Sequence, residues 1–450
     1  MTSPFRNELL FGMRALVRDN LLSQRRLRAL RRNESMSRAQ LDALQAGLLH
    51  KTLRTAIARL PFYAHIPRDF PVAAAADVLR DAFPIIDKDT LLANREGLYP
   101  NGGARQLWQT LGKTSGTTGA PLGVFRSVQS LLMEQAFVKR HWAWGGYHDG
   151  MVRATLRGDL VTGVDASKPP FWFWNRYNRQ LLVSSRHLTE AHADAIIDRL
   201  EALAPAMLQA YPSTAFTLAG LLERRSRRLR IPVIFTASEP LYAHQRALIC
   251  DRLGGKVMDM YGMAERVAFA SACEHGNLHV NPDYAYVEIV DGDGRPTDGE
   301  GYVVGTTFHN HAMPLVIYRL CDRTRWKPGL CACGRAFPMI DSISGKFEDA
   351  ITGSDGAPVS ASVLTFAFKG LDHIRKSQVA QVGPASWEVR VVPLPGFTPA
   401  HQQYLVDNIH QLVDPHVVVK VVLKDDLPNT AAGKFRWVVN EYQPPGNPPE

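Results

Sequence analysis

From about residue 100 onward, short β-rich runs alternate with helical patterns, and this alternation most constrains the fold. The runs 231–237, 256–260 and 302–308 have strand composition, whereas 191–203 has helical spacing. Strands that alternate with helices predict α/β layers. At 450 residues the chain is too long for one compact core, so we expect two domains.

The pattern of β-rich and helical segments changes near Gly345. Beyond a turn at 353–356 come the β-rich runs 378–382, 387–392 and 417–423, with helices between them, which predict a small α+β domain. We therefore expect a large α/β domain over 1–344, a small domain over 345–440 and a disordered, proline-rich tail over 441–450. Near the start, 38–59 has helical spacing and should end at Pro61.

Composition places the chain among ordinary globular proteins. No apolar run approaches the roughly 18 residues that a membrane span needs, and charges interrupt the first twenty residues, unlike a signal peptide. Five cysteines, an odd number in a long chain, argue against a disulfide framework. We expect a cytoplasmic protein without a membrane span.

The net charge of +9 could indicate a nucleic-acid partner. However, five arginines between Arg25 and Arg32 supply much of the excess, and no nucleic-acid module accompanies them. We therefore expect a solvated helix face and no nucleic-acid partner. A basic surface also suits phosphate-rich ligands such as ATP or coenzyme A.

The segment Thr114-Ser115-Gly116-Thr117-Thr118-Gly119 is rich in hydroxyls and glycine. Glycine lets backbone N–H groups turn toward an anion, and the hydroxyls add short hydrogen bonds, so the loop can surround a polyphosphate. The alternative is a solvated turn of the same composition.

Four further motifs follow the hydroxyl-rich loop in order. They are Ser238-Glu239-Pro240, Tyr261-Gly262-Met263-Ala264-Glu265, Tyr318-Arg319-Leu320-Cys321-Asp322, and 427–436, which contains Gly433-Lys434. Together the five motifs resemble the adenylate-forming superfamily of acyl-CoA synthetases. The branch they resemble is that of phenylacetate–CoA ligase-like enzymes, which includes homologues associated with capsule biosynthesis.

The resemblance implies a multi-layered N-terminal adenylation domain that holds the ATP and acid sites, followed by a small mobile α+β lid. It implies AMP-forming activation of a carboxylic acid as acyl-adenylate, with transfer to a thiol such as that of coenzyme A. A carrier-protein thiol, an amine and a hydroxyl stay open as alternative acyl acceptors. A homodimer also stays open. From a different class, the chain could be a catalytically silent, zinc-stabilised nucleotide-binding scaffold.

The resemblance also assigns roles to residues. The catalytic residues would be Lys434, bridging the acid carboxylate and the α-phosphate, Thr117 in the phosphate loop, and Glu265, a ligand of Mg²⁺. Tyr261 would stack on adenine and Asp322 would bind the ribose hydroxyls. The whole implied nucleotide site comprises Thr114, Ser115, Gly116, Thr117, Thr118, Gly119, Ser238, Glu239, Pro240, Tyr261, Gly262, Asp322 and Lys346.

Two positions depart from the family pattern. Cys321 replaces the usual glycine before the ribose-binding aspartate, which removes a permissive backbone position. Lys346 follows Gly345 where the family has arginine, so the charge is kept but the bidentate fork is lost.

The remaining cysteines and histidines suggest a metal site. Cys331 and Cys333 lie on one tight turn, and thiolates with imidazole suit tetrahedral zinc. Buried cysteines can also act as small hydrophobes. With the resemblance to zinc-carrying relatives, we predict a structural Zn²⁺ held by Cys273, His279, Cys331 and Cys333, with His275 as the alternative histidine.

An aromatic segment, 171–174, could line an aryl pocket together with His141, Trp142 and Trp144. Core packing explains the same residues equally well. The sequence does not identify the acid.

Overall fold

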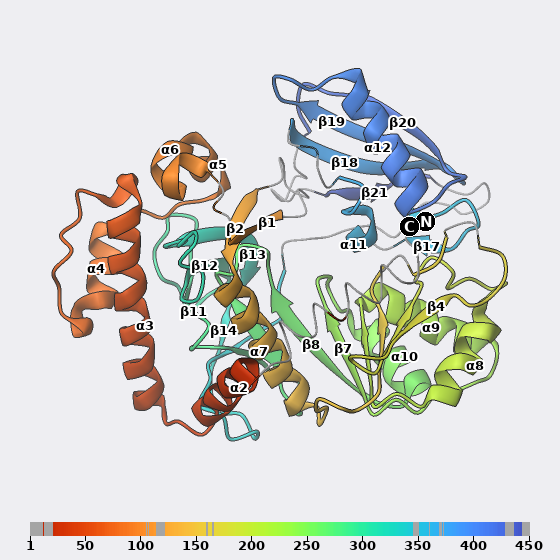
Figure 1. Cartoon of the computed structure of the whole chain (residues 1–450), viewed down its shortest axis with the longest axis horizontal. Coiled ribbons are helices and arrows are strands. Elements are labelled where there is room, and N and C mark those ends of the chain that lie inside the picture. The colour runs from red at the N-terminus through yellow and green to blue at the C-terminus, as the bar shows by residue number, and fades with distance from the viewer. Residues whose placement is uncertain are drawn as a thin grey trace.

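The structure is a computed structural model of the whole chain (Figure 1). It describes residues 12, 21–104, 106, 108–113, 122–158, 161–163, 166–344, 351–359, 361–368, 371, 373–427 and 436–442. The proline-rich tail predicted over 441–450 therefore lies outside the described residues from 443 onward.

A ten-stranded sheet organises the large domain, in the order β14-β15-β10-β9-β8-β7-β6-β3-β5-β4. The stretch from β8 to β5 is parallel, and antiparallel pairs flank it on both sides. The parallel strands are short runs of mostly apolar, mostly buried residues, as expected where both faces of a sheet are covered. The strands of the whole sheet are β3 Arg153–Leu156, β4 Trp172–Asn175, β5 Gln180–Val183, β6 Met207–Ala210, β7 Val233–Ala237, β8 Lys256–Gly262, β9 Phe269–Ala272, β10 Leu278–Val280, β14 Trp326–Lys327 and β15 Met339–Ile340.

Helices cover both faces of this sheet. Three of them, α8 (Ala193–Leu203), α9 (Pro212–Arg224) and α10 (Ala243–Leu253), share a core with Leu208, Ile234 and Val257. The neighbouring residues of the same strands point to the other face, where they pack with α7 (Val128–Trp144). In Figure 1, α8, α9 and α10 lie together at the lower right, whereas α7 lies at the lower centre. The predicted α/β layering is confirmed.

The N-terminal third packs around a second sheet, which has the order β11-β12-β13. Its capped helix α3 (Arg38–Arg59) begins after Ser37 and ends at Leu60, before Pro61, as predicted. The core of this region joins α3 to the sheet and to the β1–β2 hairpin. The other elements are α2 Leu21–Asn33, α4 Ala75–Ala82, α5 Lys88–Ala93, α6 Arg95–Leu98, the 3₁₀ turns Pro61–Tyr63, Val72–Ala74 and Pro100–Gly103, β1 Gln109–Lys113, β2 Gly123–Ser127, β11 Ala285–Val290, β12 Gly301–Thr307 and β13 Tyr318–Thr324.

The C-terminal domain has a core of its own, centred on Trp387 and Trp437. Its four-stranded sheet has the order β20-β19-β18-β21 and carries α12 (Pro399–Leu412), which confirms the small α+β domain. The other elements are β16 Ile351–Thr352, β17 Pro358–Val359, α11 Ala361–Leu364, β18 Ile374–Gly383, β19 Ser386–Pro393, β20 Val418–Leu423 and β21 Val438–Asn440.

The two domains touch beside β3 and β5. Arg186, which follows β5, forms an ion pair of 3.1 Å with the fully buried carboxylate of Asp414 in the small domain. Gly158, which follows β3, lies so close to α11 that a Cβ there would be 2.8 Å from Val363 Cγ2. Figure 1 shows the small domain in blue above this part of the large domain.

The structure decides how the arginines of α2 and the aromatic residues near 141–144 and 171–174 are to be interpreted. On α2, Arg25, Arg28, Arg31 and Arg32 are exposed, as expected of a solvated face. His141, Trp142 and Trp144 are buried against the sheet, whereas Phe171 belongs to a different core, so these aromatic residues do not line one pocket. No helix that the structure describes is both long enough and apolar enough to cross a membrane.

Candidate active site and metal centre

The parallel strands of the large sheet all end at one edge. Directly after β3, β6, β7 and β8 come Arg157, Tyr211, Ser238 and Met263, respectively. Ligands of open α/β sheets bind outside the carboxyl ends of the strands, so this edge is the candidate active site. Two of the sequence motifs, at Ser238 and at Tyr261, lie on it.

Tyr261 and Asp322 come together from different sheets. Tyr261 lies near the end of β8, and its hydroxyl donates to Asp322 Oδ2 on β13 at 2.8 Å. Asp322 is only 6% exposed. Burial, with the negative charges of Asp322 and Glu265, raises the pKa of Tyr261 well above its usual range. The phenol therefore stays protonated at neutral pH and orients the carboxylate.

The Ser238-Glu239-Pro240 motif turns sharply after β7. Ser238 has φ of +76°, and its hydroxyl accepts a hydrogen bond of 3.2 Å from Arg157. Glu239 accepts a hydrogen bond of 3.1 Å from the backbone N–H of Ser213, in the first turn of α9. A carboxylate is favoured there by the helix dipole, which holds the motif against the sheet edge.

Glu265 follows β8 in a loop that two arginines anchor. Arg126 on β2 donates to the carbonyl of Ala264 at 2.6 Å, and Arg266 donates to Ser130 Oγ at 2.6 Å. Glu265 is half-buried, and Gly262 is exposed at the end of β8. The contact of Arg126 also brings the β1–β2 hairpin, which carries residues 114–121, to the edge of the large sheet.

Several predicted site residues lie outside the described parts of the chain. They are Thr114, Ser115, Gly116, Thr117, Thr118, Gly119, Lys346 and Lys434. Their roles stay predictions.

Four cysteine and histidine side chains form a second cluster. The ligand atoms of Cys273, His279, Cys331 and Cys333 all lie within 4.8 Å of one another. Two of the distances are 3.6 Å between the sulfurs of Cys273 and Cys331, and 3.5 Å from Cys333 Sγ to His279 Nε2. A tetrahedral zinc with bonds of about 2.3 Å to sulfur separates its ligand atoms by about 3.8 Å, so the cluster has the size of a zinc site.

Neighbouring groups orient these side chains for a metal. His279 Nδ1 lies 2.9 Å from the carbonyl of Phe337, so this nitrogen donates its proton and leaves the lone pair of Nε2 facing the sulfurs. Asn277 donates to Cys331 Sγ at 3.1 Å. Burial raises the pKa of the Cys273 thiol, whereas hydrogen bonds to Cys331 outweigh its burial and lower its pKa. His275 is not part of the cluster.

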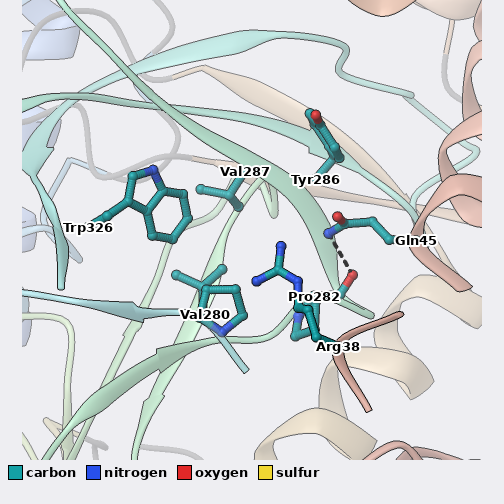
Figure 2. A pocket seen from close by; sticks show the side chains of 8 residues that line it. Arg38, Gln45, Val280, Pro282, Tyr286, Val287 and Trp326 are labelled. Carbon is teal, nitrogen blue, oxygen red and sulfur yellow. Dashed lines mark hydrogen bonds between the residues drawn. The ribbon is translucent and has the colours of Figure 1, made fainter. Parts of the chain in front are cut away.

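A cavity of about 210 Å³ lies elsewhere, between α3 and the strands β10, β11 and β14. Figure 2 shows Arg38 and Trp326 facing this space and Gln45 bonded to the carbonyl of Pro282, at 3.1 Å. None of the motif residues lines it. It is therefore not the candidate active site.

Arg157 and Tyr211 were not singled out from the sequence. The guanidinium of Arg157 lies over the ring of Tyr211, 5.0 Å from its centroid. The available signal was the position of Arg157, directly after the short run Ala154-Thr155-Leu156 and directly before Gly158. A polar residue at such a place lies at the carboxyl edge of a sheet.

Known proteins resemble this chain along most of its length. It is 30% identical over 341 residues to the phenylacetate-coenzyme A ligase of Escherichia coli (strain K12), covering 71% of this chain and 74% of that protein. The ligase of the same name from Thermus thermophilus is 26% identical over 352 residues, covering 71% and 73%. The Protein CapK of Staphylococcus aureus is 23% identical over 212 residues, covering 46% of each.

Two further comparisons concern the domains and the fold. Residues 351–441 match the family of the CapK C-terminal domain. A crystal structure of 2-hydroxyisobutyryl-CoA ligase, in complex with 2-HIB-AMP and CoA, superposes with a TM-score of 0.56 at 18% identity. The superposition covers 91% of this chain and 92% of that one, so the fold extends over both domains.

Proposed function

The chain belongs to the phenylacetate-coenzyme A ligase family, and on that basis we propose that it joins a carboxylic acid to coenzyme A at the expense of ATP. In the first half-reaction a carboxylate oxygen attacks the α-phosphorus of ATP, forming acyl-AMP and releasing pyrophosphate. In the second, the thiol of coenzyme A attacks the acyl carbon and AMP leaves.

The observation that carries this proposal is the hydrogen-bonded pair of Tyr261 and Asp322 at the carboxyl edge. Their side chains come from residues 61 positions apart and meet at 2.8 Å. The carboxylate accepts hydrogen bonds from the ribose hydroxyls, and the ring of Tyr261 offers a face to adenine. A protein that only needed a packed core would gain little from burying a carboxylate there, because burial of a charge is costly.

The phosphates lie on the side of the β1–β2 hairpin. Residues 114–119 supply backbone N–H groups and hydroxyls to them, and Glu265 supplies a carboxylate that would hold Mg²⁺. The arrangement supports this because Arg126 joins β2 to Ala264, next to Glu265, at 2.6 Å. Mg²⁺ bound there would neutralise phosphate charge.

The small domain is a mobile lid that carries Lys434. It has a separate core, and the contacts of Arg186 and Gly158 define where it now rests on the large domain. The proposed hinge is Gly345–Asp349, which includes Lys346 and lies outside the described residues. The cluster of Cys273, His279, Cys331 and Cys333 holds a structural Zn²⁺, because four protein ligands leave no position for a substrate.

The first expected result concerns the products. ATP and an acceptable acid should give AMP and pyrophosphate, because attack falls on the α-phosphorus. Nucleotide chromatography and a pyrophosphate assay across aryl and alkyl acids, with and without coenzyme A, measure this. Release of ADP and phosphate alone would contradict the proposal. Product formation that needs a carrier protein or an amine in place of coenzyme A would change the acceptor but keep the adenylation.

The second expected result concerns the nucleotide site. Asp322→Asn should raise the KM for ATP roughly 10- to 100-fold, because hydrogen bonds to a charged acceptor are lost. Tyr261→Phe keeps the ring and should raise it only about fivefold. Tyr286→Phe is a matched control, since Tyr286 also donates to a carboxylate, Glu288 at 3.3 Å, on the antiparallel strand β11. Equal effects of all three variants on KM would remove Tyr261 and Asp322 from the nucleotide site.

A further inference from the structure

Arg157 is a cation held in one orientation at the candidate active site. It follows β3, and its guanidinium lies 5.0 Å from the centroid of the Tyr211 ring while it donates to Ser238 Oγ at 3.2 Å. The side chain thus spans from β3 across β6 to the turn after β7. Because both partners are neutral, neither neutralises its charge.

No carboxylate among the described residues lies within ion-pair distance of Arg157. The carboxylate of the neighbouring motif, Glu239, accepts a hydrogen bond from the backbone of Ser213 instead, at 3.1 Å. Arg157 is half-buried, and a guanidinium fixed in such surroundings matches the planar geometry of a carboxylate or a phosphate. The site therefore favours an anionic ligand group.

The turn at Ser238, which belongs to the proposed nucleotide site, lies between Arg157 and Tyr261, so Arg157 lies on the side of this turn away from Tyr261 and Asp322. In the proposed function Tyr261 and Asp322 bind adenine and ribose at β8 and β13, and Arg126 of β2 contacts Ala264, which follows β8. In the sheet, β7 and β6 separate β8 from β3. With strands about 4.8 Å apart, β3 lies about 14 Å from β8. The group that meets Arg157 thus comes from the acid side of the edge.

The small domain closes over the same place. Gly158, the residue after Arg157, lies against Val363 of α11, with 2.8 Å between a Cβ built there and Val363 Cγ2. Ligand sites occur preferentially where two domains meet. Arg157 is thus located at the domain interface, where an acyl substrate would be covered.

We propose that Arg157 determines specificity by binding a second anionic group of the acyl substrate, so that the preferred substrate is a dianionic acid. One carboxylate is activated by ATP, and the other anionic group, a carboxylate or a phosphate, is held by the guanidinium. An aryl or alkyl acid that has no second anionic group leaves this cation without a partner. Such an acid is the poorer substrate.

The test compares phenylacetate with 4-carboxyphenylacetate, which has the same skeleton and a second carboxylate, in ATP–pyrophosphate exchange without coenzyme A. Since the inference rests on the proposed function, exchange with any acid tests that function, and the preference between the two acids tests Arg157. We expect the wild type to prefer the dianion in kcat/KM. Arg157→Gln should lower kcat/KM for the dianion roughly 10- to 100-fold, mainly through KM, and lower it much less for phenylacetate. Arg157→Lys should recover part of the preference.

Arg153→Gln is the matched control, because Arg153, at the other end of β3, also lies over an aromatic ring and donates to a neutral side chain. Its guanidinium lies 5.0 Å from the ring centroid of Trp142, and it donates to Gln180 Oε1 at 3.2 Å. This variant should keep the preference. Equal loss for both acids in Arg157→Gln, or the same loss in Arg153→Gln, would overturn the inference.

Two other outcomes are also decisive. If Arg157→Gln raised only the KM for coenzyme A, the anion would be a phosphate of the thiol substrate and the inference would be wrong. If no acid supported exchange, the proposed function would fail, and calorimetric titration with 4-carboxyphenylacetate would still decide the inference. Weaker binding by Arg157→Gln than by the wild type supports it, and equal affinity or no binding by either overturns it.

Discussion

Replacement of Lys434 by alanine should slow acyl-adenylate formation by roughly a hundred- to a thousandfold. In the proposed reaction, negative charge shifts between the acid carboxylate and the α-phosphate during attack. A fixed ammonium group at that point stabilises the transition state more than the bound substrates, typically by about 3–4 kcal/mol. The loss should therefore appear in kcat for pyrophosphate exchange, with a smaller change in KM.

The structure constrains where Lys434 belongs, although residues 428–435 lie outside its described parts. Before them, the carbonyl of Leu427 accepts a hydrogen bond from Lys376 at 3.1 Å. After them, the carbonyl of Arg436 accepts one from Gln378 at 2.8 Å, and Trp437 is buried in the core of the small domain. Both anchors lie on β18, so Lys434 must move with the small domain.

That attachment leads to different expectations for the two half-reactions. Thioester formation from supplied acyl-AMP should be affected much less by Lys434→Ala, because in the proposed two-orientation lid the lysine has turned away by then. Lys420→Ala is the control, since Lys420 is an exposed lysine on β20 of the same domain. Equal losses in both half-reactions would contradict a two-orientation lid, and unchanged exchange would contradict the role of Lys434.

Local patterns explain why much of the fold could be predicted from the sequence. Helix α3 was predicted at its observed bounds because Pro61 prevents its continuation and its apolar spacing is regular. The strands β7, β8 and β12 were predicted within two residues at their ends, because each is a short apolar run bounded by turns or helical segments. The separate core of the small domain followed from a change of pattern near residue 345.

The order of strands in the sheet depends on contacts between distant parts of the chain. For this reason the sequence did not predict Arg157 as a site residue. Arg157 meets Ser238, 81 residues away, only because β6 alone separates β3 from β7. The spacing of Arg157 and Ser238 along the chain does not predict this contact. The same reasoning applies to Trp142 and Trp144, whose aromatic composition suggested a pocket as readily as a core. Helix α7 turns them into the sheet, where they pack with Phe235 and Phe337.

The cysteine cluster leads to the largest expected change in stability. Cys331→Ser should abolish zinc binding and lower the thermal transition of the large domain by on the order of 8 °C. A metal at a thousandfold excess over its dissociation constant stabilises the folded state by about 4 kcal/mol. In a domain of this size, each kcal/mol shifts the transition by about 2 °C.

The physical reason is that the cluster joins three separate parts of the sheet edge. Cys273 follows β9, His279 lies on β10, and the turn with Cys331 and Cys333 connects β14 to β15. Just beyond that turn, Arg335 pairs with Glu274 at 2.8 Å, and its guanidinium lies 4.2 Å from the ring centroid of Trp144. Loss of the metal should therefore loosen the turn and the surroundings of Trp144, with a change in tryptophan fluorescence.

Elemental analysis of protein purified without added metal, together with thermal unfolding, measures both effects. Cys250→Ser is the control, because Cys250 is a half-buried cysteine on α10, outside the cluster, and it should leave zinc content and the transition nearly unchanged. Chelation of the wild type should reproduce the loss seen in Cys331→Ser, and added zinc should restore the wild type alone, because only the wild type keeps all four ligands. Zinc far below one equivalent in the wild type, with no further decrease in Cys331→Ser, would mean that these four residues pack as ordinary buried side chains.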